Sequence, residues 1–438
     1  MKRLNFLAVL LACAGLFVAA HSQTYNDVRI AHIFANWRDT VPTKFYERAR
    51  INGFNYVLIQ ITMLGEKGNP NPAWSNGEYD TTHANAKLLN WLRKEFKKAD
   101  TYGLKIIPEL ATNNKRGAMW DDTDNNNIAW QNRLPNNLHD EEIKKAIIRT
   151  PAFAPDTAFE RTFKWGLTAV CKAFKNARNM DGLSYSQLDY IHFGADEPTY
   201  SLSVRGKNVV LANLCATDTL WLRGKNLHTG TVQTKITALL GISIRRKAEM
   251  IREVGILYGH NAIKGMYYAD MLDPFSLGGY FQLVGFNSYA NPTWNSFSSP
   301  ISTYDGLADN ADVRAVIDKS VPVVWNYTSH AYDDTLKTYD TYATFSHLKN
   351  KGFKFMYGSA LTENGNPVEQ SRIAHLTRQG GIAASPVFYG FLIGAASFHW
   401  CRNINSFNDA KDKYDQAPEF RTMEYLSSTL WYNIAALE

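Results

Sequence analysis

The stretch Leu188-Asp-Tyr-Ile-His-Phe-Gly-Ala-Asp-Glu-Pro-Thr-Tyr200 is an apolar run that passes a glycine and then delivers two adjacent carboxylates, Asp196 and Glu197. Its apolar and aromatic residues predict a β-strand over Leu188 to Gly194. In barrel enzymes the active site lies at the carboxyl ends of the strands. This stretch therefore predicts both a strand and the position of the chemistry.

Working outward from this stretch, strand-like runs alternate with helical patterns. Ala84 to Tyr102 places its leucines and aromatic residues on one stripe and stops at Gly103, and Pro155 to Ala177 repeats phenylalanines at helical spacing. Each helical pattern leads into the next strand candidate. The strand candidates are Arg29 to Trp37, Asn55 to Met63, Leu104 to Leu110, Leu188 to Gly194, Lys264 to Met271, Phe281 to Tyr289, Val321 to Tyr327, Phe353 to Ala360 and Leu392 to Trp400.

Such alternation, with no Gly-rich phosphate loop after the first strand, favours a closed (β/α)8 barrel of the α/β class over an open nucleotide-binding sheet. The candidates are one more than the eight strands of a barrel, and we expect Phe281 to Tyr289 to lie in a loop. Neither a repeat nor a linker marks a second folded unit. The sequence predicts a single catalytic domain over residues 23–438.

Two connections are much longer than usual, and they predict where function lies. One follows the third strand, from Thr112 to about Thr150, and the other follows the fourth, from Tyr200 to about Thr234. Both leave carboxyl ends of strands, so both are expected on the active-site face.

The amino terminus predicts export. Residues 1–22 combine the positive charges of Lys2 and Arg3, an apolar stretch and a small-residue cleavage site before Gln23, as a secretory signal does. A lipoprotein signal ending at Cys13 is the less favoured alternative. Later segments lack the approximately 18 uninterrupted apolar residues of a membrane helix. We expect a secreted or periplasmic protein without a membrane span.

The amino-acid composition indicates which classes of binding partner to expect. Removing Lys2 and Arg3 from the 47 basic residues leaves 45 against 41 acidic ones, and this net charge of +4 has no long single-sign run. Neither nucleic acid nor an anionic membrane is indicated. The 11 Trp and 23 Tyr suit stacking on sugar faces, although large cores also use them. Three cysteines follow the signal, Cys171, Cys215 and Cys401, so at most one internal disulfide forms.

Asp196 and Glu197 can share a pocket only if the chain bends after the strand, because adjacent strand side chains point to opposite faces. Gly194 and Pro198 favour such a bend. Carboxylates that lie close together have different pKa values, and one of them then stays protonated and acts as an acid. The alternative is a solvated pair at the protein surface.

Several segments resemble glycoside hydrolase family 20, the β-N-acetylhexosaminidases. Ile191-His-Phe-Gly-Ala-Asp-Glu197 is similar to that family's His-x-Gly-x-Asp-Glu signature, and Gly103-Leu-Lys-Ile-Ile-Pro-Glu109 to its strand-three Gly-x-x-x-Ile-Pro-Glu. Tyr267-Tyr-Ala-Asp-Met-Leu272 is similar to its strand five, and Val323-Val-Trp-Asn-Tyr327 to a later Trp-bearing strand. The resemblance covers residues 28–403.

The resemblance implies substrate-assisted retention, an exception to the two-carboxylate scheme. Glu197 would be the general acid/base, and Asp196 would orient the 2-acetamido group of an oligosaccharide or glycan substrate. Neither a metal nor another cofactor is implied. Aromatic side chains at strand ends would line the sugar, and His192 would support the acids or be a buried core histidine. The candidate substrate-binding residues are Gln60, His192, Asp270, Trp325, Tyr327 and Trp400.

The chain also departs from the family pattern. After Glu109 the expected Asp-x-Pro-Gly-His is replaced by Leu110-Ala-Thr-Asn-Asn114, and the last strand ends in Trp400-Cys-Arg402 instead of Trp-x-Glu. We also do not expect the small α/β domain that often precedes the barrel in that family. These departures leave the recognised sugar and its linkage open.

Two alternatives therefore remain. Asp196-Glu197-Pro198 also resembles the Asn-Glu-Pro motif of two-carboxylate retaining glycosidases, and Leu361-Thr-Glu-Asn-Gly365 resembles the nucleophile motif of family 1 β-glucosidases, with Glu363 as the nucleophile. That mechanism needs the carboxyls of Glu197 and Glu363 about 5 Å apart. The other alternative is a barrel that binds carbohydrate without turnover, because a fold does not by itself imply a function. The sequence gives no oligomeric state.

Overall fold

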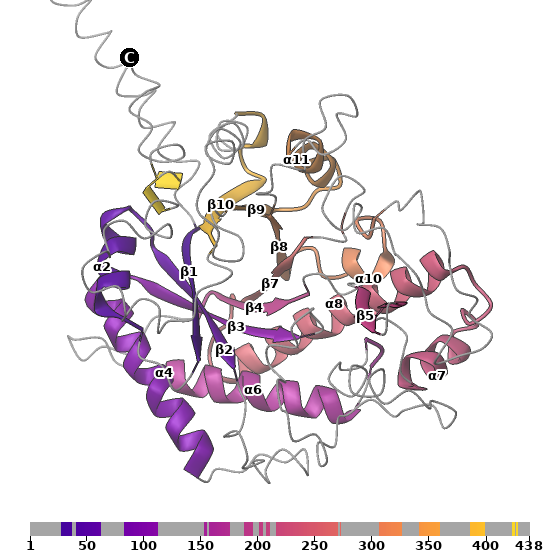
Figure 1. Cartoon of the computed structure of the whole chain (residues 1–438), viewed down its shortest axis with the longest axis horizontal. Helices are drawn as coiled ribbons and strands as arrows, with labels where there is room; N and C mark the ends of the chain where they lie inside the picture. Colours follow the sequence, from indigo (N-terminus) through magenta and orange to yellow (C-terminus); the bar gives the residue numbers. More distant parts are fainter. Residues whose placement is uncertain are drawn as a thin grey trace, which may run out of the picture.

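The fold is a closed barrel of eight parallel strands (Figure 1), seen in a computed structural model of the chain. The strand order around the barrel is β1-β10-β9-β8-β7-β4-β3-β2, so that the first and last strands pair and close the sheet. The residues that the structure describes are 28–36, 41–62, 83–112, 153–155, 157–175, 188–195, 201–204, 207–210, 216–269, 272, 306–325, 341–359, 386–398, 423–424 and 426–427.

Helices alternate with the barrel strands along the chain. The barrel strands are β1 (Val28–Asn36), β2 (Tyr56–Thr62), β3 (Lys105–Thr112), β4 (Tyr190–Gly194), β7 (Lys264–Tyr268), β8 (Ser320–Trp325), β9 (Phe355–Ser359) and β10 (Leu392–Ser397). The helices are α2 (Thr43–Ile51), α4 (His83–Thr101), α6 (Thr157–Lys175), α7 (Ala216–Gly224), α8 (Val232–Leu257), α10 (Ala311–Arg314) and α11 (Thr341–Asn350), with a 3-10 turn at Pro386–Phe388.

The predicted fold class is confirmed, and eight of the predicted strands are the barrel strands. The helices predicted over Ala84 to Tyr102 and Pro155 to Ala177 are α4 and α6, shifted by one or two residues. The extra candidate, Phe281 to Tyr289, lies outside the described residues. The single-domain boundary and the export signal stay predictions.

The segment after β4 differs from the expected long loop. It contains a two-stranded antiparallel hairpin, β5 (Ser201–Val204) with β6 (Lys207–Val210), followed by α7. The sequence alternates serine with leucine and valine over Ser201–Val204, a pattern typical of a strand. An insertion with structure of its own thus follows the strand that delivers the acidic pair.

The strands bury both faces, and the two faces form separate apolar clusters. Outward side chains such as Ile191 and Phe193 of β4 pack against the covering helices in an outer cluster. Inward side chains fill the barrel in an inner cluster, as expected for a barrel whose interior is packed and not a pore. The inner cluster consists of Val28, Ile30, Tyr56, Leu58, Ile107, Met266, Tyr268, Val321, Val323, Trp325, Met356, Ala396 and Phe398.

A glycine makes room for a large inner side chain near the carboxyl end of the barrel. A Cβ atom at Gly358 of β9 would lie 2.2 Å from Phe398, closer than any real contact allows. Phe398 therefore lies over β9 and reaches the rings of His32 and Tyr268, with centroid distances of 5.4 and 5.7 Å. This close approach sets the position of the Phe398 ring in the inner cluster near the carboxyl end of the barrel.

The amino end of the barrel carries a small polar group. The carboxylate of Asp189 accepts hydrogen bonds from the hydroxyl of Tyr56 and the ammonium of Lys105, each at 2.7 Å. These contacts join β2 and β3 to the residue that precedes β4, at the amino-terminal face, where residues in barrels serve stability. The opposite face, at the carboxyl ends of the strands, is where barrel enzymes have their active sites.

One cysteine is a buried, free thiol. Cys171 of α6 is fully buried, and burial raises the pKa of its thiol to about 12. Because the thiolate is the reactive form, we expect the Cys171 peptide to stay unlabelled by iodoacetamide at about pH 8 in the native protein and to be labelled in denaturant. Peptide mass mapping checks this, and native labelling of Cys171 would contradict the packing of α6. Cys215 and Cys401 lie outside the described residues.

Among the helices that the structure describes, none combines the length and the apolar character that crossing a bilayer requires.

Candidate active site at the carboxyl end of β4

Strand β4 ends at Gly194, and both this residue and the next, Ala195, have a left-handed backbone conformation. Gly194 has φ of 75° and Ala195 has φ of 72°. Glycine adopts this conformation without cost, whereas an alanine there costs roughly 1–2 kcal/mol. Strain of this kind clusters at functional sites. The bend that the acidic pair requires is therefore present immediately before Asp196, although Asp196 and Glu197 themselves lie outside the described residues.

Below this turn, four buried polar side chains meet inside the barrel, and we call them the inner polar cluster. They are His32 of β1, Glu109 of β3, His192 of β4 and Tyr268 of β7, all at most 2% exposed. The tyrosine hydroxyl donates to Glu109 Oε1 at 3.3 Å. Glu109 Oε2 lies 3.7 Å from His32 Nε2, and Oε1 lies 3.5 Å from His192 Nδ1. Glu109 is the centre of the cluster.

The cluster holds Glu109 as an anion. Burial alone would raise the pKa of this carboxyl, but its contacts within the cluster outweigh burial and lower its pKa to about 2. Burial lowers the pKa of His32, which favours the neutral imidazole at neutral pH. An ionised carboxylate thus lies in the barrel interior beneath the β4 turn. A fixed carboxylate at such a position can stabilise a positive charge that comes near it.

Aromatic packing fixes these polar groups in place. The rings of His192 and Tyr268 lie with centroids 4.3 Å apart, and Phe398 contacts both Tyr268 and His32 edge-on. Side chains that are packed on several sides keep a single rotamer. The inner polar cluster is therefore pre-organised.

The structure places three of the predicted substrate-binding residues. His192 belongs to the inner polar cluster, and Trp325 ends β8 within the inner apolar cluster, 9% exposed. The backbone of Gln60 pairs with Glu109 in the β2–β3 register. Their contact with a substrate stays a prediction. The predicted residues that lie outside the described residues are Asp196, Glu197, Asp270, Tyr327 and Trp400, together with Glu363 of the alternative.

Sequence reasoning did not assign a site role to His32, Glu109 or Tyr268. Each occupies an inward position of an otherwise apolar strand, such as His32 two residues after the inward Ile30. A polar residue at such a position is uncommon without a function or a partner. Alternate residues of a strand point to the same face, so a search of each strand for polar residues at its inward positions would have found these three residues.

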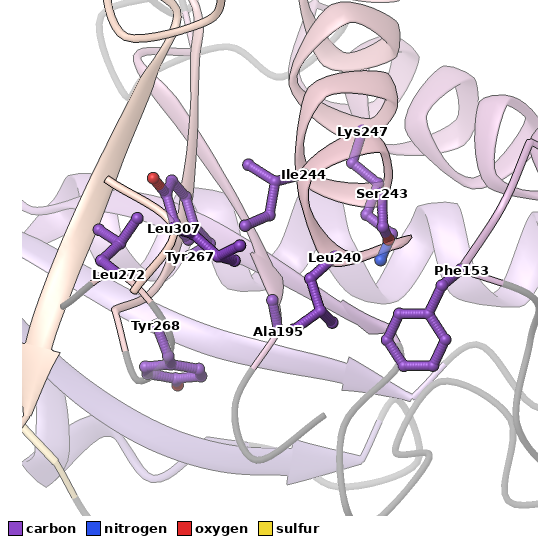
Figure 2. A pocket seen from close by; sticks show the side chains of 10 residues that line it. All are labelled: Phe153, Ala195, Leu240, Ser243, Ile244, Lys247, Tyr267, Tyr268, Leu272 and Leu307. Atoms are coloured by element: carbon purple, nitrogen blue, oxygen red, sulfur yellow. The ribbon is translucent and has the colours of Figure 1, made fainter. Parts of the chain in front are cut away.

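A pocket opens beside the turn, between the barrel and α8 (Figure 2). Figure 2 shows α8 side chains on one side, Tyr267, Leu272 and Leu307 on the other, and Ala195 between them. The lining residues from α8 lie three or four positions apart and therefore share one face of the helix; they are Leu240, Ser243, Ile244 and Lys247. The lining residues are Phe153, Ala195, Leu240, Ser243, Ile244, Lys247, Tyr267, Tyr268, Leu272 and Leu307.

Lys247 in this pocket is 2% exposed, and burial lowers the pKa of its ammonium from 10.5 to about 7. The unfolded chain keeps the proton up to pH 10.5, while the folded chain releases it near pH 7. Between these values the unfolded state binds more protons, so the free energy of unfolding rises with pH, by at most about 5 kcal/mol.

We therefore expect Lys247→Met to be more stable than the parent at about pH 7 and to lose this advantage by about pH 10. Urea denaturation of both proteins at several pH values across this range measures the difference. A stability difference that is constant over the range would contradict the assigned burial of the charge.

Within the part of the chain that the structure describes, no group of three or more His, Cys, Asp or Glu side chains is arranged to hold a metal ion.

Comparison with known proteins bears on the fold. No profile of a known protein family and no curated protein matches the sequence. The catalytic domain of a β-amylase from Paenibacillus polymyxa is similar in structure, with a TM-score of 0.50 and 11% identity over 93% of this chain and 99% of that chain. A catalytic module of the pneumococcal exo-β-D-N-acetylglucosaminidase StrH has a TM-score of 0.46 and 10% identity, covering 94% and 86%. A chitobiase from Flavobacterium johnsoniae has a TM-score of 0.44 and 11% identity, covering 93% and 51%. The similarity to the β-amylase domain supports the barrel fold.

Proposed function

We propose that this chain is an exported glycoside hydrolase that cleaves a β-N-acetylhexosaminide by substrate-assisted retention. The observation that carries the proposal is the left-handed turn at Gly194 and Ala195, which ends a barrel strand directly before Asp196 and Glu197. Barrel enzymes place their catalytic residues at this end of the strands. The turn supplies the bend that two adjacent carboxylates need to serve one pocket.

In the proposed reaction, Glu197 protonates the glycosidic oxygen as the bond to the anomeric carbon breaks. The carbonyl oxygen of the substrate's 2-acetamido group attacks the same carbon and forms a cyclic oxazolinium. Asp196 orients the acetamido group and stabilises the positive charge on its nitrogen. Glu197, now a carboxylate, takes a proton from water, which opens the ring with retention.

The inner polar cluster supports this chemistry. The oxazolinium and the transition states that flank it carry positive charge, and the ionised Glu109 lies in the barrel beneath the turn. A fixed carboxylate in a water-excluded interior stabilises such charge more than the same group in water does.

A panel of aryl glycosides tests the proposed class of enzyme. The protein is assayed with aryl β-glycosides of N-acetylglucosamine, N-acetylgalactosamine, glucose, galactose and mannose, and we expect release of the aryl alcohol from an N-acetylhexosaminide. Binding of oligosaccharides without hydrolysis of any glycoside in the panel would favour the carbohydrate-binding barrel instead.

A two-carboxylate retaining glycosidase is the second candidate. Strand β9 ends at Ser359, so Glu363 follows a strand's carboxyl end by four residues, as a nucleophile would. This mechanism forms a covalent glycosyl-enzyme. A 2-fluoro glycoside with a good leaving group would then leave a stable adduct on the Glu363 peptide. An unmodified mass after prolonged incubation excludes this candidate.

A further inference from the structure

His192 has two neighbours at the same ring nitrogen. The backbone N–H of Gly194 points at Nδ1 from 3.1 Å, and Glu109 Oε1 lies 3.5 Å from Nδ1. A neutral imidazole nitrogen carries either a proton or a lone pair, so Nδ1 serves one of these neighbours and not both. The shorter contact has hydrogen-bond length and the longer one does not. The geometry therefore places the lone pair on Nδ1 and the proton on Nε2, which has no hydrogen-bond partner among the described residues. In this tautomer His192 does not donate to Glu109, and the groups that face the carboxylate as donors are the Tyr268 hydroxyl and His32.

The hydrogen bond lies inside the turn itself. His192 is the last residue of β4 in register with β7, where it pairs with Met266. On the β3 side the register shifts between Glu109 and Thr112, so the regular ladder is interrupted before Gly194. A buried backbone N–H needs an acceptor. Nδ1 of His192 is that acceptor for the N–H of Gly194, which lies two residues later in the chain.

We propose that His192 is a positioning residue whose Nδ1 holds the Gly194–Ala195 turn and so fixes where the chain delivers Asp196 and Glu197. Its link to catalysis rests on the proposed function, whereas the hydrogen bond does not. The ring is fully buried and packs against Tyr268 with centroids 4.3 Å apart. The acceptor is therefore rigid, as a residue that sets a turn should be.

Three substitutions distinguish the contribution of Nδ1 of His192 from that of Nε2. In His192→Asn the new side-chain oxygen lies near the place of Nδ1, whereas in His192→Gln the new amide reaches the place of Nε2, and His192→Ala has neither. We expect kcat on the best aryl glycoside to fall about 100-fold in His192→Ala and His192→Gln, with KM changed by less than about threefold. His192→Asn should recover at least about tenfold of that loss.

His260 provides the matched control, because it makes the same kind of bond at the other end of the same strand. Its Nδ1 accepts from the backbone N–H of Leu188 at 3.0 Å, and its side chain is 3% exposed. His260→Ala should lower Tm, as the loss of a buried acceptor does, while kcat of the folded protein stays within about twofold. A kcat loss equal to that of His192→Ala would overturn the positioning role.

A measurement without substrate tests the hydrogen bond itself. Imidazole 15N NMR distinguishes the two neutral tautomers, and we expect the Nε2–H tautomer for His192, assigned by its disappearance in His192→Asn. The Nδ1–H tautomer, with the proton toward Glu109, would overturn the proposal. If the protein hydrolyses no glycoside, the proposed function fails, and this tautomer still decides the structural part. Equal kcat values for folded His192→Asn and His192→Ala would also overturn it.

Discussion

Glu197→Gln is expected to reduce hydrolysis of an aryl N-acetyl-β-glucosaminide by about 10³-fold to 10⁴-fold. Glutamine keeps the shape of the side chain but has no proton to give to the glycosidic oxygen, and general acid–base catalysis contributes this order of magnitude. Asp196→Asn should lower kcat by about 100-fold, because it loses the charge that stabilises the oxazolinium. Initial rates over a range of substrate concentrations measure both effects.

Glu253→Gln is the control for these two variants. Glu253 lies on α8 with its side chain 52% exposed, paired with Lys164 at the surface, and its substitution should leave kcat within about twofold. Undiminished activity of Glu197→Gln, with folding verified by circular dichroism, would refute the assignment of the acid/base.

Glu109→Ala is expected to have the largest effect on stability. It removes the carboxylate at the centre of the inner polar cluster and leaves the Tyr268 hydroxyl and the His32 ring facing a buried gap. Removing one partner of a buried charged group costs about 3–5 kcal/mol. Glu109→Gln keeps the volume and one acceptor, so it should cost less. Urea denaturation at neutral pH measures both losses, and a change below about 1 kcal/mol in Glu109→Ala would contradict the cluster geometry.

The same carboxyl predicts how stability changes with acid. The folded pKa of Glu109, about 2, lies below its unfolded value of 4.5, so its contribution is present above pH 4.5 and is lost as pH falls toward 2. His32 changes the free energy of unfolding in the same direction. Its pKa is lowered in the folded protein, so as pH falls below 6.5 the unfolded chain binds a proton before the folded chain does, and stability decreases. In Glu109→Gln the loss between pH 4.5 and 2 should be smaller than in the parent. Parallel curves of unfolding free energy against pH for the two proteins would contradict this.

Much of the fold could be predicted because its signals are local. The apolar stripe of α4 and the glycine that follows it, Gly103 with φ of 65°, define a helix end within a few residues of sequence. The apolar run from Leu188 to Gly194 likewise predicts β4, which begins two residues later at Tyr190 and ends at Gly194. Repeated alternation of such signals leaves few topologies, since parallel strands joined by helices pack in one handed arrangement.

Strand parity marks the members of the inner polar cluster as inward polar residues, but which of them meet could not be predicted in the same way, because their contacts depend on the register between strands. His32, Glu109 and Tyr268 come from strands far apart in sequence, and a shift of one residue would turn each side chain to the outer face. The β5–β6 hairpin was missed because its strands have only four residues each, too few for a clear period. The motif around residues 191–197 indicated the position of the site but not the network beneath it.

The most direct test of the proposed function compares two substrates that differ at one position of the sugar. The kcat/KM values for an aryl N-acetyl-β-glucosaminide and for the matching aryl β-glucoside are measured on the same protein preparation at the same pH. Substrate-assisted catalysis needs the 2-acetamido carbonyl as its nucleophile, so the first value should exceed the second by at least about 10³-fold, as expected when an intramolecular nucleophile is lost. Equal values, or a faster glucoside, would contradict the proposal.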